Sequence, residues 1–471
     1  MRPLYDLVVL GGGAAGLVAA IVGASLGAKT AIVERDRLGG ECTWRGCVPS
    51  KALLHVASIA HGVRVAKVFG MVDAEPHVVW TKVRAYLDRT REAIYTRADS
   101  PEALARFGVR TIAGDAAFLD ARRLLVCGRD ARVTLTARAF VICAGSDPTP
   151  LELDVPYETT DTIFDLEECP QRLAIIGGGP ASFELAQAFA RLGTLVHVVS
   201  TATRPLENDD AEHARVLRAV LEGEGVRFSL GVRVVASSRF EKTTVLKLSD
   251  ASEIPCDRVL VAIGRTPRVA GYGLEAAGVI VRDGAIVVDT RGRTNVAHIS
   301  AAGDAIGPPY FSHVAEETAK VAVANALLGV RKRFDRAAVP WCTFTSPELA
   351  HVGSTAATLR KRGTRFSTYA FANDELDRAI VDDATTGSTK LFVGRGGRVL
   401  GASILGARAG ELNCEVALAI GTKLTAAKIA DTVYPYPSYG YGVRRAADAW
   451  YERLATSFVR RIIRTVFRFR G

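Results

Sequence analysis

Residues Tyr5–Gly16 read YDLVVLGGGAAG, an apolar and β-branched run that leads directly into a glycine-rich turn. This pattern predicts a buried parallel strand over Tyr5–Leu10, followed by a helix that ends near Leu26. A second strand is expected over Thr30–Val33, directly before Glu34. A G-x-G-x-x-G pattern alone is weak, but a strand before it, a helix after it and an acid about 20 residues further on make it specific.

Each glycine of this turn has its own physical task. Gly11 permits the tight turn, Gly13 lets the backbone approach a pyrophosphate, and Gly16 allows the helix to pack closely on the strand. Glu34 is placed to accept a hydrogen bond from a ribose hydroxyl. The stretch therefore predicts a site for the ADP part of a dinucleotide.

The same pattern returns downstream, where Leu173–Ile176 runs into the sequence GGGPAS. Gly177 and Gly179 take the turn positions, and Ser182 stands where a third small residue is needed. A helix is expected over Phe183–Leu192. Two such units in one chain predict two bound nucleotides.

The strand expected over Leu195–Val199 ends in Ser200-Thr201 and offers no acid. A carboxylate at this point would bind a ribose 2′-hydroxyl, whereas Arg204 nearby suits a 2′-phosphate. The sequence therefore favours NADPH over NADH at the second unit.

Residues Gly39–Lys51, close behind the first unit, read GGECTWRGCVPSK. We predict that Cys42 and Cys47 form a redox-active pair, because a helix N-terminus or a cation such as Lys51 lowers a cysteine pKa toward neutral pH. By spacing alone, two unrelated packing cysteines are an equal alternative. The nucleotide-binding units on either side favour the redox interpretation.

The composition is that of a soluble globular enzyme of about three domains, with 471 residues of which 48% are hydrophobic and 23% charged. The net charge of +10 is spread along the chain except at the C-terminus, so no nucleic-acid partner is predicted. No resident metal site is predicted. The remaining cysteines are scattered singly, as in a reducing cytoplasm, and each is expected to be a buried thiol: Cys127, Cys143, Cys169, Cys256, Cys342 and Cys414.

The run Leu7–Ala28 has no charged residue and is long enough to cross a membrane. Because it divides into a short strand, a glycine turn and an alanine-rich helix, we predict that it lies in a soluble domain. No other stretch is expected to compete as a membrane span.

Two turns and one strand end complete the expected nucleotide sites. Gly145 lies in the turn Cys143–Ser146 and Gly264 in the turn Gly264–Pro267, each after a predicted strand. Asp304 follows the strand expected at residues 297–303. Since the carboxyl ends of parallel strands face the ligand crevice, Asp304 is a candidate partner for a polyol hydroxyl, with a helix N-cap as the alternative.

These motifs, together with TSPELA from Thr345 and AGE from Ala409, resemble the class I pyridine nucleotide-disulfide oxidoreductases: glutathione reductase, lipoamide dehydrogenase and mercuric reductase. The resemblance covers nearly the whole chain. It implies an α/β fold with two Rossmann-like domains, for FAD and NAD(P), and an α+β dimerisation domain whose partner copy completes the active site. The expected ranges are 1–150 (FAD), 151–268 (NAD(P)), 269–337 (return to the FAD domain) and 338–471 (dimerisation).

The resemblance also implies residue roles. Lys51 matches a lysine near the flavin N5, and Glu184 matches the glutamate that pairs with it. Cys47 matches the thiol that forms a charge-transfer complex with the flavin, and Cys42 matches the exposed interchange thiol. Electrons would pass from NADPH through flavin to the Cys42–Cys47 disulfide and then to an acceptor. The cofactor contacts implied are Gly11, Gly13, Gly16, Glu34, Lys51, Gly145 and Asp304 for FAD, and Gly177, Gly179, Ser182, Arg204 and Gly264 for the nucleotide side.

The C-terminal region departs from the members that reduce organic disulfides. They resemble one another in a His-Pro-Thr-x-x-Glu segment, where this chain has Tyr436 at the histidine position and Tyr441 at the glutamate position. His351 is the last histidine of the chain. A phenol, with a reference pKa of about 10, is a poor base near neutral pH, so reduction of glutathione disulfide or lipoamide is disfavoured.

Mercuric reductases resemble the chain better here, since they also place a tyrosine at that position, although their C-terminal vicinal cysteines are missing. We therefore predict a mercuric-reductase-like flavoprotein whose acceptor is Hg(II) or another thiol-reactive or disulfide compound. Two alternatives stay open: a quinone or oxygen reductase or transhydrogenase that does not use the dithiol, and a nucleotide-binding sensor without turnover.

The tail Phe458–Arg470 interleaves arginines with large apolar residues. We expect a terminal helix packed on its own dimer or a frayed solvated end. Contact with an anionic membrane surface is the less favoured alternative.

Overall fold

The computed structural model describes residues 4–129, 131–454 and 457–470, which form two compact units. Unit 1 contains residues 1–177, 192–194 and 235–334, and unit 2 contains residues 178–191, 195–234 and 335–471. The boundary at residues 177 and 178 falls inside the second glycine turn. The four predicted domain ranges stay a prediction.

The main sheet of unit 1 has the strand order β3-β2-β1-β6-β5-β4, with β19 paired to β6. Central β1 runs parallel to both neighbours, with Leu7 opposite Thr30 and Val8 opposite Phe140. The return strand β19 also runs parallel to β6, which joins residues near 300 to the N-terminal sheet. The strands are β1 Tyr5–Leu10, β2 Thr30–Glu34, β3 Arg110–Ala113, β4 Asp115–Asp120, β5 Arg123–Cys127, β6 Arg132–Ile142 and β19 Ile299–Ala301.

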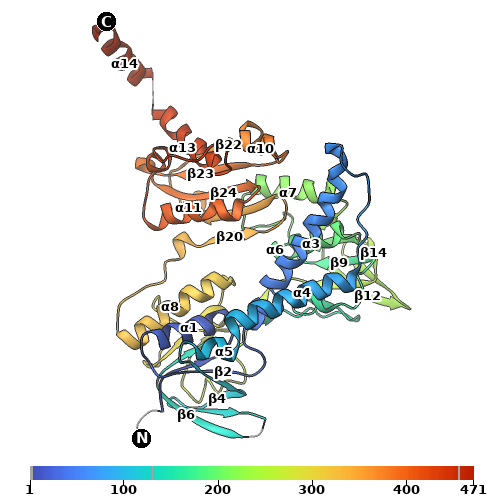
Figure 1. Cartoon of the computed structure of the whole chain (residues 1–471), viewed down its shortest axis with the longest axis vertical. Coiled ribbons are helices and arrows are strands. Elements are labelled where there is room, and N and C mark those ends of the chain that lie inside the picture. Colours follow the sequence, from blue (N-terminus) through green and yellow to red (C-terminus); the bar gives the residue numbers. More distant parts are fainter. Residues whose placement is uncertain (1–3, 130, 455–456, 471) are drawn as a thin grey trace. The chain divides into compact units, whose positions relative to one another are not determined.

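Helices α1 (Ala14–Ser25) and α8 (Ser312–Leu328) lie side by side over this sheet (Figure 1). Small residues make the close approach possible: a Cβ placed on Gly16 would overlap the carbonyl oxygen of Gly11. Leu7 and Val9 of β1 are fully buried under α1. Burial of such side chains stabilises the fold by about 1.5–3 kcal/mol each.

The helices that follow carry the candidate site and cover the sheet edge. They are α2 Gly40–Trp44, α3 Cys47–Val65, η1 Ala66–Phe69, α4 Trp80–Ile94, η2 Tyr95–Asp99 and α5 Pro101–Ala105. The helical run Gly40–Phe69 is the one run among the described residues that is long and apolar enough to cross a membrane by length and composition. The expectation that Leu7–Ala28 is the one stretch long and apolar enough to pass as a membrane span is therefore wrong. Leu7–Ala28 itself forms β1, its turn and α1, as predicted.

The rest of unit 1 contains further small sheets. Strand β15 runs parallel to β9 and β8, and β12, β13 and β14 form a three-stranded sheet. Strand β7 pairs antiparallel with β16, so that Ser146 lies opposite Pro267. The elements are β7 Ser146–Pro148, β8 Glu158–Thr159, η3 Ile163–Asp165, β9 Arg172–Ile176, β12 Val234–Phe240, β13 Thr243–Leu248, β14 Glu253–Cys256, β15 Arg258–Val261, β16 Arg265–Pro267, β17 Val281–Arg282, β18 Ala285–Ile286 and η4 Gly303–Ile306.

Unit 2 is built on an antiparallel sheet with the order β20-β21-β24-β23-β22, against which α11 and α13 pack (Figure 1). Its centre is apolar and fully buried, as at Val352, Leu391 and Val443. The elements are α6 Pro180–Arg191, β10 Leu195–Ser200, α7 Ala211–Gly223, β11 Arg227–Leu230, η5 Arg336–Ala338, β20 Pro340–Thr343, β21 Glu348–Gly353, α9 Ala356–Lys361, β22 Ser367–Ala372, η6 Asn373–Glu375, α10 Asp377–Val381, β23 Ser388–Val393, η7 Arg395–Gly397, β24 Val399–Gly406, α11 Ala409–Gly421, α12 Ala426–Ala430, α13 Gly440–Leu454 and α14 Ser457–Arg470.

The expectation for the scattered cysteines is only partly met. Cys143 and Cys256 are buried, and burial raises the pKa of the Cys256 thiol to about 11. Cys414, on the outer face of α11, is exposed, so the prediction of a buried thiol is wrong there. The remaining three are partly buried: Cys127, Cys169 and Cys342.

Substitution of Gly16 by alanine tests the close helix contact. Because its Cβ would overlap the Gly11 carbonyl, we expect Gly16→Ala to lower the free energy of unfolding by about 1–3 kcal/mol and to weaken FAD retention. Urea denaturation and the ratio of flavin to protein absorbance measure both effects. Gly62→Ala in α3 is the control, since no atom lies within 4 Å of its Cβ position. Equal behaviour of the two variants would contradict the contact.

Candidate active site

Cys42 and Cys47 lie on two consecutive helices, α2 and α3. Cys42 is in the single turn of α2, and Cys47 is the first residue of α3, as predicted for a thiol at a helix N-terminus. The chain enters α2 through Gly39 in the left-handed conformation, with φ 97°. A side chain there would be strained, which explains the glycine before the cysteine loop.

The two thiols contact one another and a serine from α8. Cys47 Sγ lies 3.3 Å from Ser312 Oγ. Hydrogen bonding with Cys47 and burial raise the pKa of Cys42, while the Ser312 hydroxyl opposes this shift. The expectation of a lowered pKa is therefore wrong for Cys42, because the hydrogen bond with Cys47 and burial raise it.

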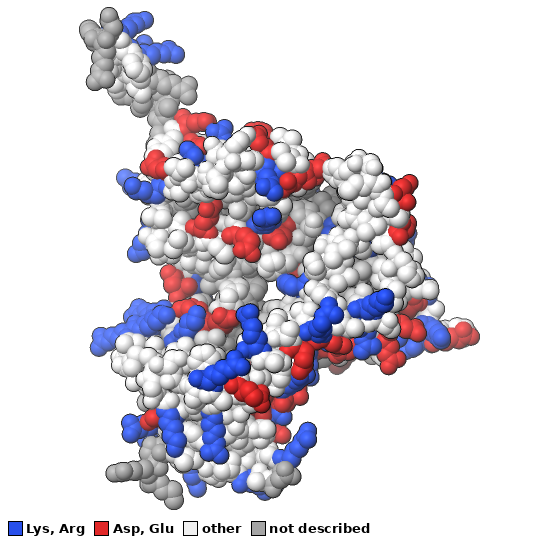
Figure 2. Space-filling model, viewed as in Figure 1, with Lys and Arg blue, Asp and Glu red and all other residues white. Residues whose placement is uncertain are grey.

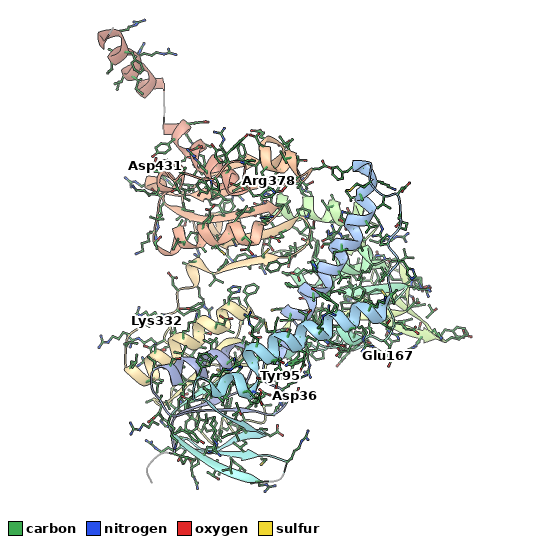
Figure 3. The ribbon with its side chains drawn as sticks, in the orientation of Figure 1. Asp36, Tyr95, Glu167, Lys332, Arg378 and Asp431 are labelled. Atoms are coloured by element: carbon green, nitrogen blue, oxygen red, sulfur yellow. The ribbon has the colours of Figure 1, made fainter. Side chains whose placement is uncertain are left out.

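Trp44 fixes the loop between the cysteines. Its indole N–H donates to the Leu38 carbonyl at 2.8 Å, and the Arg37 guanidinium stacks 3.5 Å from the ring centre. Tyr95 packs against the same ring at 5.2 Å, and Asp36 accepts from Arg45 at 3.2 Å. Tyr95 and Asp36 are labelled in Figure 3. These contacts hold the segment between the two cysteines against the rest of unit 1.

Glu41 lies beside both thiols. Its carboxylate occupies the space over Gly46, where a Cβ would overlap it, and its Oε1 lies 3.7 Å from the Arg265 guanidinium. Burial raises the pKa of Glu41 to about 7; Arg265 lowers it, and the charge of Cys47 raises it further. A carboxyl group that titrates near neutral pH therefore lies next to the dithiol.

Arg265, from the turn at Gly264, connects three segments of unit 1. Its side chain donates to Ser146 Oγ at 2.8 Å and to Asp161 at 3.1 Å. Ser146 Oγ in turn donates to Asp304 at 2.5 Å. Burial raises the pKa of Asp304, and the bond from Ser146 lowers it.

Asp304 is not a helix cap. Helix α8 follows Phe311 and has no side-chain cap, so the N-cap alternative is wrong. Asp304 instead lies in η4, shortly after β19, and accepts a hydrogen bond from Ser146. Gly145, before Ser146, has φ 75°, and Gly264 has φ 120°, conformations that side chains rarely adopt.

The first glycine turn fits the ADP part of FAD. Gly11 has φ 98° and a Cβ there would overlap the Cys143 carbonyl, whereas a Cβ on Gly13 would make only an ordinary contact, 3.9 Å from the Cα of Gly40. Helix α1 begins without a side-chain cap, which leaves its first N–H groups for a pyrophosphate. Glu34 accepts from the Gly12 N–H at 2.5 Å and so lies at this turn.

The second turn has a comparable geometry in its described parts. Gly179 has no atom within 4 Å of its Cβ position. Ser182 is fully buried, and its hydroxyl has no hydrogen-bond partner among the described residues, in keeping with a packing role. Arg204 donates to the backbone carbonyls of Glu207 and Asp209.

Lys51 and Glu184 belong to different units. Lys51 is in α3, and Glu184 is a buried residue of α6 that accepts from the Phe344 N–H at 2.9 Å. Their pairing stays a prediction.

Tyr436 and Tyr441 lie together in unit 2, with ring centres 5.9 Å apart. The Tyr436 hydroxyl donates to Asp377 at 2.5 Å, and this bond raises the pKa of Tyr436. His351 is fully buried, stacked on Trp341 at 4.3 Å, and burial lowers the pKa of His351 to about 4. It therefore stays neutral in the core, away from solvent.

Arg378 and a further tyrosine extend this polar cluster. Tyr439 donates to Asp382 at 2.8 Å, and Arg378, labelled in Figure 3, pairs with the same carboxylate at 2.7 Å. The phenols of Tyr436 and Tyr439 are therefore both hydrogen-bond donors to carboxylates.

Comparison with known proteins agrees with the geometry. Residues 5–326 match the family "Pyridine nucleotide-disulphide oxidoreductase", and residues 339–447 match its dimerisation domain. The chain belongs to the pyridine nucleotide-disulphide oxidoreductase family. It is therefore an FAD-dependent oxidoreductase that uses a pyridine nucleotide, with the α/β architecture and the dimerisation domain predicted from the sequence.

Relatives in this family differ in their acceptors. The chain is 35% identical to a dihydrolipoyl dehydrogenase of Thermus scotoductus, over 95% of this chain and 98% of the relative. It is 33% identical to a mercuric reductase of Streptomyces lividans, over 95% of this chain and 96% of the relative.

Solved structures of related proteins have the same fold. LpdA from Mycobacterium tuberculosis superposes with a TM-score of 0.89 at 27% identity, over 94% of this chain and 99% of that chain. The Cu(II) complex of the HOCl-induced flavoprotein disulfide reductase RclA from Escherichia coli gives 0.83 at 26% identity, over 95% and 100% of the two chains.

Three residues of the oxidoreductase site were missed from the sequence. Ser312, Glu41 and the side-chain role of Arg265 depend on contacts between distant segments. Glu41 could have been noticed as an acid directly before the first cysteine of the pair. No local pattern marks Ser312, which lies 265 residues from Cys47.

Glu41→Gln tests the charge beside the thiols. Above pH 7 the ionised carboxylate raises the pKa of Cys42, so it suppresses the reactive thiolate. We expect the variant, after reduction, to be alkylated by iodoacetamide several-fold faster at pH 8, with no difference at pH 5, where Glu41 is already neutral. Glu168→Gln, an exposed acid, is the control. Identical pH profiles for Glu41→Gln and the wild type would refute this effect.

Ser312→Ala tests the hydroxyl contact with Cys47. A hydrogen bond to a charged group contributes about 1.5–3 kcal/mol, so we expect the pKa of the Cys47 thiol to rise by about one to two units. The readout is the pH dependence of the long-wavelength thiolate-to-flavin absorbance in the two-electron-reduced protein. Ser58→Ala is the control, because the Ser58 hydroxyl donates to the His55 carbonyl of its own helix. An unchanged profile in Ser312→Ala would exclude the contact.

Proposed function

We propose that this enzyme passes electrons from NADPH through FAD to the Cys42–Cys47 pair and then to an acceptor that bonds directly to thiolate sulfur, with Hg(II) as the leading candidate. The observation that carries the proposal is the dithiol beside Ser312 at the start of α3. The two thiols contact one another, which suits exchange between a disulfide and two thiols.

The C-terminal tyrosines support a metal ion over an organic disulfide. Reduction of a disulfide releases a thiol that needs a proton, and a general base must hold that proton. Tyr436 donates to Asp377, and this raises the pKa of its phenol, so it stays protonated. A soft metal ion needs thiolate ligands and no proton acceptor.

In this proposal the cofactor and the dithiol carry the electrons, and other residues of the chain hold the cofactor. FAD, when bound, takes a hydride from the nicotinamide and supplies an electron pair to a disulfide. Asp304, Ser146 and Arg265 would hold its polyol part. The electron pair that opens the disulfide to two thiols is the pair that the acceptor takes when the disulfide forms again, so atoms and electrons balance at each turnover.

The choice of nucleotide, the assembly and the compartment belong to the same proposal. We propose NADPH over NADH, supported by the absence of an acid in Ser200-Thr201 after β10. The dimerisation domain supports a homodimer, and we propose that Tyr436 and Tyr441 of one copy face the dithiol of the other. We place the enzyme in the cytoplasm, where thiols stay reduced.

Cys42→Ser tests whether the dithiol carries the electrons. A single thiol cannot close the disulfide, so we expect Hg(II)-dependent NADPH oxidation to fall to about 1% of the wild-type rate or less. Flavin reduction by NADPH should persist. The assay is anaerobic NADPH oxidation with Hg(II), glutathione disulfide, lipoamide and quinones as separate acceptors.

Cys414→Ser is the matched control, because Cys414 is an exposed cysteine on α11. It should retain wild-type rates. The proposal fails if Cys42→Ser keeps full activity with the preferred acceptor, or if quinones turn over while Hg(II) and disulfides do not.

A further inference from the structure

The C-terminal helix α14 covers Ser457–Arg470, and its side chains are described from residue 461 to residue 468. Every side chain described in it, from residue 461 to residue 468, is exposed. Ile462, Ile463 and Val466 are 48%, 45% and 45% exposed, and Phe467 is 69% exposed. The described part of α14 therefore buries no side chain against its own chain, and the expectation of a frayed end is wrong, since the segment is helical.

The described side chains of α14, residues 461–468, divide into two faces. At about 100° per residue, Arg461, Arg464 and Arg468 fall within roughly 60° of the helix circumference. The four exposed apolar residues fall on the opposite side, within roughly 140°. In Figure 2 this segment shows blue arginines beside white side chains and no red. Such a division into faces is typical of a helix that lies in a membrane interface.

Charge distinguishes this helix from a packing helix. The fourteen residues of α14 contain five arginines and no acidic residue. The family's dimerisation domain ends at residue 447, before α14 begins. The match to the dimerisation domain therefore does not cover α14.

We propose that α14 binds the surface of an anionic lipid bilayer, with its apolar face in the interface and its arginines at the lipid phosphates. The apolar side chains contribute by burial among acyl chains, and each arginine near an anionic surface adds about fivefold to the partition coefficient. The enzyme is then a peripheral membrane protein, held reversibly.

A second copy of α14 is a poorer occupant. Two such helices packed through their apolar faces would leave the arginines of both copies on the outer sides of the pair, and neither helix has an acid to pair with them. Anionic phosphates supply the missing opposite charge.

The test uses the full FAD-loaded protein and sedimentation with vesicles. We expect it to sediment with phosphatidylcholine vesicles that contain phosphatidylglycerol, and to stay in solution with pure phosphatidylcholine or at high salt. Arg464→Gln with Arg468→Gln should weaken the partition by about 25-fold. Phe467→Ser should weaken it as well, without a change in charge. Solution NADPH oxidation should not change in either variant.

Arg331→Gln with Arg333→Gln is the matched control, because these arginines are exposed and lie outside α14. It removes the same charge and should bind as the wild type does. The proposal is overturned if the wild type stays in solution with anionic vesicles at low salt, or if the control and α14 variants lose binding equally. It is also overturned if the variant that ends at Leu454 still binds the vesicles. The same holds if the full chain binds no vesicles and removal of the residues after Leu454 converts the dimer to a monomer.

Discussion

Arg265 holds the candidate site together. Its guanidinium bonds Ser146 and Asp161 and lies 3.7 Å from Glu41, and Ser146 passes the contact on to Asp304. A charge this deep, with a side chain only 14% exposed, is tolerable because carboxylates and a hydroxyl surround it. Glu41, directly before Cys42, and Ser146, which bonds Asp304, therefore both interact with the same guanidinium.

This anchor leaves the dithiol in an unusual acid-base setting. Family members that reduce organic disulfides resemble one another in a C-terminal histidine, and here the last histidine, His351, is neutral and buried. The groups that titrate or hydrogen bond beside the thiols are Glu41 and Ser312 instead. The pKa of Cys42 is therefore affected by residues of unit 1, whereas Tyr436 and Tyr439 of unit 2 donate hydrogen bonds to carboxylates. This arrangement favours an acceptor that needs sulfur ligands over one that needs a proton relay.

The parts of the fold that the sequence predicted are those with local causes. Strand β1, the Gly11 turn and α1 follow from hydrophobic periodicity and glycine conformations, which are visible in the sequence. The parts that it missed depend on tertiary contacts. Ser312 meets Cys47 across 265 residues, and the raised pKa of Cys42 results from burial and a second thiol.

The central claim is that electrons pass through the Cys42–Cys47 pair, and an anaerobic NADPH titration of the FAD-loaded protein tests it most directly. The account predicts that the first equivalent of NADPH produces a long-wavelength charge-transfer band from the Cys47 thiolate while the flavin stays largely oxidised, and that a further equivalent is needed to bleach the flavin. If the flavin bleaches fully with the first equivalent and no such band forms, the dithiol is not an electron carrier and the account is wrong.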